Sequence, residues 1–162
     1  PQAHYETTGV EILEDLPEVD VFVAGLGTGG TLMGVGRRLK EVNPRVQVVA
    51  AEPHPGDLVQ GLRSLDEGFV PPILDLDLLD RKIVVHSEDA ARLTRELLVR
   101  EGIFAGISSG AALHAALRVA QRMQQGNIVV LMADGGWKYL STRLWTQDIE
   151  RVGEELRSKV WL

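Results

Sequence analysis

Four glycines and two threonines stand between residues 25 and 31, in the stretch FVAGLGTGGTLMG, and these residue types suit the binding of an anion. The stretch joins a short apolar run to a segment whose apolar residues have helical spacing. A helix that begins there presents unpaired N–H groups and the positive end of its dipole, and glycines let a ligand come close to the backbone. The sequence therefore predicts a phosphate-binding loop.

Two classes of ligand compete for this loop. The spacing of Gly25, Gly27 and Gly30 matches the dinucleotide fingerprint G-x-G-x-x-G, and Glu52 ends the next apolar run, where an acid that binds a ribose belongs. The two threonine hydroxyls of the loop instead suit a single terminal phosphate, which accepts many hydrogen bonds. A turn that only closes a strand–loop–helix unit is a third interpretation.

A second group of small and hydroxyl residues, GISSGAA at 106–112, also precedes a helical segment. Loops of this kind gather at the carboxyl ends of the strands in an open α/β sheet, which is where ligands bind. We therefore expect the two loops to face one site.

Short apolar runs alternate with amphipathic stretches along the chain. Strands are predicted at 19–25, 46–52, 82–87 and 127–134. Helices are predicted at 9–16, 32–42, 88–102 with Ser87 as its N-cap, 111–126 and within 146–162, with a short helix and a loop between 56 and 75. This alternation predicts an α/β domain, a layered parallel sheet flanked by helices, and 162 residues suit a single domain.

Composition excludes several classes of function. The formal net charge is −6, from 17 basic and 23 acidic residues without a basic stripe, so nucleic acid is not an expected partner. No apolar run is long enough for a bilayer and no signal peptide opens the chain, so we expect no membrane contact and a cytoplasmic location. The absence of cysteine excludes thiolate chemistry. The four histidines do not have the spacing of a metal site, so no metal is predicted.

The ordered motifs GTGGT at 27–31, AEP at 51–53 and GISSGAA at 106–112 resemble the cysteine synthase family of fold-type II pyridoxal-phosphate enzymes. HYETTGVEI near the start and DGGWKYLST near the end match the same family, so the resemblance covers essentially the whole chain. It implies the larger, cofactor-binding C-terminal domain of such an enzyme, with pyridoxal 5′-phosphate as the cofactor.

The resemblance also implies roles for the two loops. The first loop would hold the 5′-phosphate of the cofactor through Gly27, Thr28, Gly29, Gly30 and Thr31. A serine of the second loop would hydrogen-bond the pyridine nitrogen, with Ser108 the first candidate and Ser109 the second. A neutral hydroxyl partner leaves the pyridine unprotonated, which favours elimination at the β-carbon of the substrate. An N-cap of the following helix is the alternative role for Ser108.

A catalytic lysine is missing from the matched motifs. None of Lys40, Lys82, Lys138 and Lys159 stands in the Ser-x-Lys context that the family uses for its Schiff base. In the family, that lysine and the loop that binds the substrate carboxylate lie in an N-terminal portion. Because the chain also begins in mid-motif at Pro1, we expect it to be the C-terminal part of a longer enzyme and to be inactive alone.

The stretch GLRSLDEGF, residues 61–69, resembles the actinobacterial cysteine synthase B branch, the O-phosphoserine sulfhydrylases. In that branch an arginine at the position of Arg63 meets the substrate phosphate, which suits the fork of a guanidinium group. The alternative is an exposed arginine that pairs locally with Asp66 or Glu67. The branch takes its sulfur from a small carrier protein that ends in a thiocarboxylate.

The implied activity is synthesis of L-cysteine by β-replacement on O-phosphoserine or O-acetylserine, in an enzyme that is usually a homodimer. An NAD(P)-binding Rossmann domain and a cystathionine β-synthase-like enzyme are the alternatives. The apolar end with Trp161 and Leu162 resembles a tail that folds into the active-site cleft in the same branch, and a helix end packed on a neighbour is the other interpretation.

Overall fold

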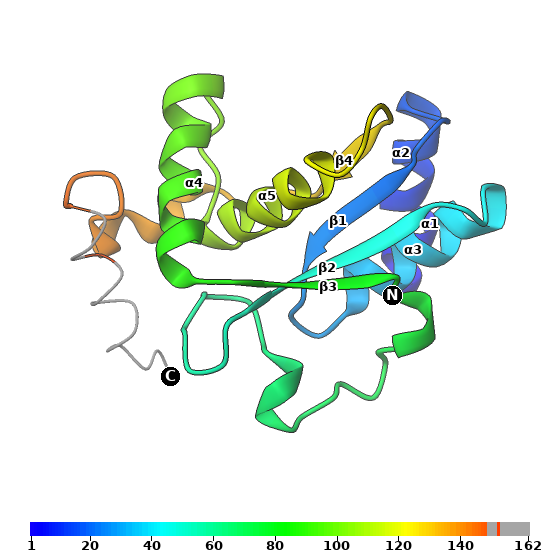
Figure 1. Cartoon of the computed structure of the whole chain (residues 1–162), viewed down its shortest axis with the longest axis horizontal. Helices are drawn as coiled ribbons and strands as arrows, with labels where there is room; N and C mark the ends of the chain where they lie inside the picture. Colours follow the sequence, from blue (N-terminus) through cyan, green and yellow to red (C-terminus); the bar gives the residue numbers. More distant parts are fainter. Residues whose placement is uncertain (149–151, 153–162) are drawn as a thin grey trace.

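The computed structural model of the chain describes residues 1–148 and Val152 (Figure 1). The expected helix within 146–162 and the position of Trp161 and Leu162 therefore lie outside the described residues, apart from the beginning of that segment. Within the described part, none of the helices is both long enough and apolar enough to cross a bilayer.

Four parallel strands form the sheet of the described residues, which confirms the predicted α/β architecture. They are β1 (Val21–Gly25), β2 (Gln47–Pro53), β3 (Arg81–Val85) and β4 (Ile128–Val130). Their order in the sheet is β3-β2-β1-β4, so β1 pairs with β2 on one side and with β4 on the other. The first residues of β1, β2 and β4 are aligned, since Val21 is the partner of Gln47 on one side and lies opposite Ile128 on the other.

The helices lie in two layers, one on each face of the sheet. The α-helices are α1 (Gln2–Glu6), α2 (Thr8–Asp15), α3 (Gly30–Val42), α4 (Ser87–Glu101) and α5 (Ile107–Ala120). Three short 3₁₀ helices are η1 (Leu65–Glu67), η2 (Leu76–Leu78) and η3 (Gly136–Thr142). Figure 1 shows α4 and α5 on one side of the strands and α1 to α3 on the other.

Alternating side chains of the strands fill two separate cores. Phe22 and Ala24 of β1 pack in one cluster with residues of α3, whereas Val21 and Val23 pack in the other with residues of α5. This separation follows from the pleat, because successive side chains of a strand point to opposite faces. Both faces of β1 are therefore buried, and the strand has the continuous apolar run expected of a covered parallel sheet.

The close packing of α4 on α5 depends on a glycine. A Cβ atom on Gly110 would collide with the carbonyl oxygen of Ala90 and with the side chain and backbone of Thr94. Only glycine fits at this crossing, and the contact fixes where α5 begins relative to the sheet.

Several predicted boundaries are wrong. The second loop is helical, because α5 begins at Ile107 instead of residue 111 and ends at Ala120 instead of residue 126. The N-cap of α4 is His86, not Ser87, although Gly102 ends this helix as predicted, with φ of 69°. The short helix and loop predicted within 56–75 are present, the helix being the 3₁₀ helix η1.

The strand order creates a switch point between β1 and β4. The chain leaves β1 through α3 toward β2, and it reaches β4 from α5 on the opposite face of the sheet. Loops that leave neighbouring strands toward opposite faces open a crevice at the carboxyl ends of those strands, and open α/β sheets bind ligands there. Both predicted loops lie at this edge.

Candidate functional site

The first predicted loop lies between β1 and α3 and has the geometry of an anion-binding turn. β1 ends at Gly25 and α3 begins at Gly30, with Gly29 as its N-cap. Gly29 has φ of 87°, a backbone conformation that side chains other than glycine rarely adopt. The first N–H groups of α3 have no carbonyl oxygen one turn earlier within the helix, so they are available to an anion.

A cavity of about 390 Å³ lies at this loop. Five separate parts of the chain contribute its walls: the end of β1 with the following loop, the loop after β2, the first turn of α5, the segment after β4, and η3. The lining residues are Ala24, Gly25, Gly27, Thr28, Gly29, Gly30, Thr31, Gln60, Gly61, Leu62, Ser108, Leu131, Ala133, Asp134, Lys138 and Tyr139. The structure thus brings both predicted loops together around one space.

Two glycines of the loop face very different surroundings. A Cβ atom on Gly27 would lie 2.7 Å from the backbone carbonyl oxygen of Gly61, so glycine lets the two loops approach each other. A Cβ atom on Gly30 would have nothing nearer than the hydroxyl of Thr28 at 3.7 Å. Gly27 therefore serves packing, whereas Gly30, which lines the cavity, could carry a methyl group with ordinary contacts only.

One of the threonine hydroxyls is held by a histidine that the sequence did not indicate. Thr31 Oγ1 lies 3.2 Å from Nε2 of His4, and Nδ1 of the same ring lies 3.0 Å from Thr8 Oγ1. The ring connects α2 to the first turn of α3 and orients Thr31. No spacing signal could have identified this contact, because 27 residues separate His4 from Thr31.

The two candidate serines have different environments. Ser108 lines the cavity with 7% of its surface exposed. Ser109 is fully buried, and its hydroxyl has no hydrogen-bond partner within the described residues. Both stand in the first turn of α5, whose N-cap is Gly106, so the alternative that Ser108 is the N-cap is wrong.

Asp134, Lys138 and Tyr139 form a polar group on the opposite wall. The Tyr139 hydroxyl donates to Asp134 Oδ2 at 2.8 Å, and Lys138 Nζ lies 3.5 Å from the same oxygen. Burial, and then the neighbouring carboxylate, raise the pKa of Tyr139 above its ordinary range. The other oxygen of Asp134 is buried, has no hydrogen-bond partner within the described residues, and packs against Gly106, where a Cβ atom would collide with it.

Glu52, the ribose-binding candidate of the dinucleotide interpretation, has a structural role instead. Its side chain is 1% exposed, Oε2 accepts the N–H of Leu65 at 3.0 Å, and Lys82 Nζ lies 3.1 Å from Oε1. The carboxylate holds the loop after β2 against β3. It is not among the residues around the cavity.

Arg63 lies on the loop after β2, next to the lining residues Gln60, Gly61 and Leu62, and its side chain is exposed. The backbone N–H of Arg63 donates to the carbonyl oxygen of Leu26 at 2.8 Å. The guanidinium carbon lies 5.6 Å from the centre of the Phe69 ring. No ion pair joins Arg63 to Asp66 or Glu67 in the part of the chain that the structure describes, so the local pairing considered above is not found.

These features define a class: an open α/β domain with an anion-binding cavity at its switch point, built from a glycine–threonine loop and the first turn of a second helix. Residues 1–134 match the family described as "Pyridoxal-phosphate dependent enzyme". The chain belongs to this family, and the cofactor of the family is pyridoxal phosphate.

The relatives are cysteine synthases. The cysteine synthase of Aquifex aeolicus is 44% identical over 151 residues, covering 90% of this chain and 46% of that protein. Cysteine synthase B of Pseudomonas aeruginosa is 39% identical over 146 residues, covering 90% of this chain and 49% of that protein. The chain spans about half the length of these curated relatives.

Solved structures agree. O-acetyl serine sulfhydrylase isoform 3 of Entamoeba histolytica superposes with a TM-score of 0.82 at 34% identity, covering 96% of this chain and 50% of that one. A hydrogen sulfide-producing enzyme of Fusobacterium nucleatum superposes with a TM-score of 0.81 at 40% identity, covering 86% of this chain and 50% of that one. The fold is therefore that of the fold-type II pyridoxal-phosphate enzymes.

The residues around the cavity fit the phosphate of this cofactor. The loop offers backbone N–H groups at a helix N-terminus together with two threonine hydroxyls, and both line the cavity. Many donors that converge on one point suit a phosphate dianion.

Replacement of Gly27 and of Gly30 by alanine should separate packing from cofactor binding. We expect Gly27→Ala to destabilise the cofactor-free protein by about 1–3 kcal/mol, because the new methyl group pushes against the Gly61 backbone. Gly30→Ala should leave the melting temperature of the cofactor-free protein within about 2–4 °C of that of wild type. It should nevertheless weaken the binding of pyridoxal phosphate about tenfold or more. Thermal melts and fluorescence titrations measure the two effects, and unchanged affinity in Gly30→Ala would contradict a phosphate at this position.

The raised pKa of Tyr139 predicts how the protein responds to alkali. Since the folded state disfavours the phenolate, this group contributes stability below its ordinary pKa of about 10, and that contribution is lost as the pH rises further. We expect the stability of Tyr139→Phe to fall less steeply above about pH 10 than that of wild type. Urea unfolding across this range measures the difference, and parallel curves would show that the phenol ionises normally.

Proposed function

We propose that the protein carrying this chain is a pyridoxal-phosphate-dependent cysteine synthase, which replaces the β-substituent of an activated L-serine with sulfur. The observation that carries the proposal is the cavity, where the glycine–threonine loop and Ser108 meet in a chain 44% identical to a cysteine synthase. Relatives of this fold include an O-acetyl serine sulfhydrylase and a hydrogen sulfide-producing enzyme, whose names both describe sulfur chemistry.

Each part of the cavity has a role in this proposal. The loop from Gly27 to Thr31 binds the cofactor phosphate, and His4 keeps the Thr31 hydroxyl in place. Ser108 hydrogen-bonds the pyridine nitrogen from the opposite helix. When bound, the cofactor supplies an electron sink for removal of the α-proton and of the β-leaving group. A hydroxyl at the ring nitrogen carries no charge, so the chain leaves the ring neutral and favours β-elimination.

The Schiff-base lysine, we propose, comes from a part of the protein outside this chain. Lys138 is the cavity-lining lysine among the described residues, and its ammonium group lies beside the Asp134 carboxylate in an exposed position. Lys138 also does not stand in the Ser-x-Lys context that the family uses for its Schiff base. In this proposal residues 1–162 make up most of the C-terminal, cofactor-binding domain and have no β-replacement activity alone.

The proposed amino-acid substrate is O-phosphoserine in preference to O-acetylserine. Support comes from Arg63, whose guanidinium group is not neutralised by Asp66 or Glu67 and stands on the loop that contributes Gln60 to Leu62 to the cavity wall. Guanidinium groups bind phosphate through two parallel hydrogen bonds. By the same resemblance, the sulfur donor is a carrier protein with a thiocarboxylate end, and the full enzyme is a cytoplasmic homodimer.

Reduction with borohydride tests the position of the lysine. The full polypeptide encoded by the reading frame around this sequence should contain a pyridoxyl-lysine adduct upstream of Pro1, detected by peptide mass spectrometry. The Lys138→Ala variant should carry the same adduct. An adduct on Lys138 itself would refute the two-part site, and a protein without bound cofactor would refute the proposed function.

Substitution of Arg63 tests the substrate. In Arg63→Ala the phosphate of the substrate loses its guanidinium partner. We therefore expect this variant to raise KM for O-phosphoserine about tenfold or more and to change KM for O-acetylserine less than about twofold. Arg100→Ala is the control, because Arg100 is also exposed but lies on α4. Equal effects on both substrates would contradict phosphate recognition, and formation of cystathionine from homocysteine would favour the cystathionine β-synthase-like alternative.

A further inference from the structure

Two histidines that lie far apart in the sequence are neighbours at the edge of the sheet. His54 directly follows β2 and His86 directly follows β3, and the register pairs Pro53 with Val85 just before them. The N–H of His54 donates to the carbonyl oxygen of Val85 at 2.9 Å. Parallel pairing thus fixes the two imidazoles side by side, with ring centres 4.4 Å apart and planes inclined by 25°.

A carboxylate completes the group. Asp57 Oδ2 lies 3.1 Å from His86 Nδ1 and accepts the N–H of Ser87 at 3.0 Å, so the first turn of α4 holds the carboxylate in place. One possible ligand atom from each of His54, Asp57 and His86 lies within 4.8 Å of the other two. The Asp57 side chain is 11% exposed, while both histidines are exposed, so the anchored group is the carboxylate and the rings can adjust.

The hydrogen bonds of the two rings indicate which nitrogen of each can bind an ion. Nδ1 of His54 lies 2.8 Å from the carbonyl oxygen of Pro55, which can only accept, so this nitrogen donates. Nδ1 of His86 likewise faces a carboxylate oxygen. In the neutral His54 ring the proton is therefore on Nδ1, and the lone pair of Nε2 is free. In His86 the nitrogen next to the carboxylate is Nδ1, so an ion that both His86 and Asp57 bind takes the place of the proton between them.

We propose that His54, His86 and Asp57 bind a divalent transition-metal ion of the zinc type. Two imidazoles and one carboxylate suit Zn²⁺, Ni²⁺ or Cu²⁺, whereas Mg²⁺ and Ca²⁺ favour oxygen ligands alone. Ligands about 2.0–2.2 Å from one ion cannot be more than about 4.4 Å apart, and an imidazole binds an ion in the plane of its ring. Binding therefore requires an exposed ring to turn out of the stacked arrangement. The ion would join the start of the loop after β2 to the start of α4.

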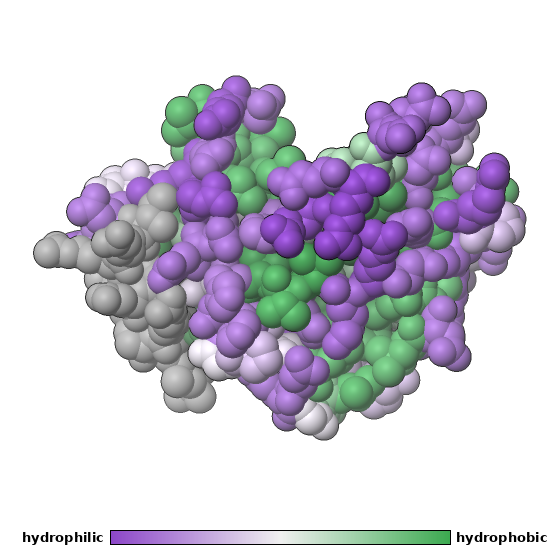
Figure 2. Space-filling model, in the orientation of Figure 1, coloured by the Kyte–Doolittle hydropathy of each residue, from purple (hydrophilic) through white to green (hydrophobic). Residues whose placement is uncertain are grey.

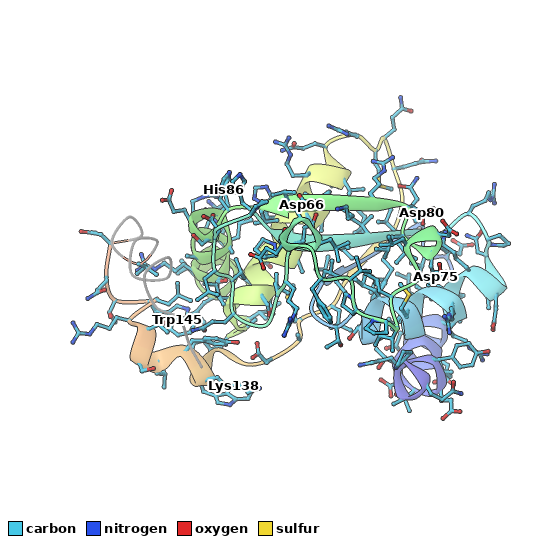
Figure 3. All side chains as sticks on the ribbon, turned by 90° about the horizontal axis from the view of Figure 1, so that it is seen from below. Asp66, Asp75, Asp80, His86, Lys138 and Trp145 are labelled. Atoms are coloured by element: carbon cyan, nitrogen blue, oxygen red, sulfur yellow. The ribbon has the colours of Figure 1, made fainter. Side chains whose placement is uncertain are left out.

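This site is separate from the cofactor cavity. Neither histidine lines the cavity, and in Figure 3 His86 and Lys138 lie on opposite sides of the molecule, one above the other in the view. A second, basic hollow of about 580 Å³ begins at His86 and runs along β3, with Arg81, Arg118 and Arg122 around it. Strongly hydrophilic residues gather over this side of the molecule in Figure 2. These cations lie outside the ligand group, and Glu88 and Asp89 in the first turn of α4 counter their charge near His86.

Calorimetric titration with Zn²⁺ tests the proposal on the full polypeptide after treatment with a chelator. We expect one ion to bind to wild type, and His54→Ala and His86→Ala each to weaken that binding about tenfold or more. In Asp57→Asn the side chain can still accept a hydrogen bond from the Ser87 N–H, but it loses its charge. This variant should therefore weaken binding of the ion as well. The matched control is His114→Ala, since His114 faces Asp89 at 4.0 Å in the basic hollow but belongs to no such group.

The same titration overturns the proposal if wild type binds no ion, or if the three site variants bind it as tightly as His114→Ala does. Metal-free melting temperatures confirm that each variant is folded. Titrations with and without pyridoxal phosphate make the result independent of the proposed enzyme activity. In a crystal soaked with Zn²⁺, an anomalous scattering peak between the two rings would locate the ion, and a peak only elsewhere would refute the assignment.

Discussion

Parallel pairing of β1 with strands on both of its sides is the constraint on which the other features depend. Because β2 and β4 are both in direct register with β1, the segments that leave their carboxyl ends emerge at one edge of the sheet. α3 follows β1 on one face of the sheet and α5 precedes β4 on the other, and the first turns of both helices flank a cavity at this edge. The glycine–threonine loop and Ser108 face each other for this reason, although about 80 residues separate them in the sequence.

The loop after β2 contributes one wall of the cavity, and polar contacts hold it at several points. The buried carboxylate of Glu52 accepts the N–H of Leu65 and pairs with Lys82. Asp57 ties the start of the loop to α4, and Gly61 touches Gly27 through its backbone. Burial of the Glu52 carboxylate without such partners would cost about 3–5 kcal/mol, so its contacts with Leu65 and Lys82 stabilise this position of the loop. The loop is long and mostly irregular, yet its ends are fixed.

The sequence predicted the elements whose signals are local. The apolar runs located all four strands to within a few residues, and Gly102 marked the end of α4. It misplaced the start of α5, because Gly110 and two serines have low helix propensity, whereas the close contact with α4 requires glycine there. The contacts of His4 with Thr31 and of His54 with His86 could not be predicted, since they arise from helix packing and strand register.

The glycine–threonine loop and the side chain of Arg63 differ in how firmly the structure holds them. The loop is fixed by a left-handed Gly29, by backbone contact at Gly27 and by the first turn of α3. Arg63, in contrast, is exposed, and within the described residues its guanidinium group lies over the face of Phe69. Structures similar to this chain include an O-ureido-L-serine synthase and an O-acetyl serine sulfhydrylase, whose names both contain a serine substituted at its oxygen. An exposed side chain such as Arg63 can change without moving the glycine–threonine loop, because that loop is held by backbone conformation and backbone contacts.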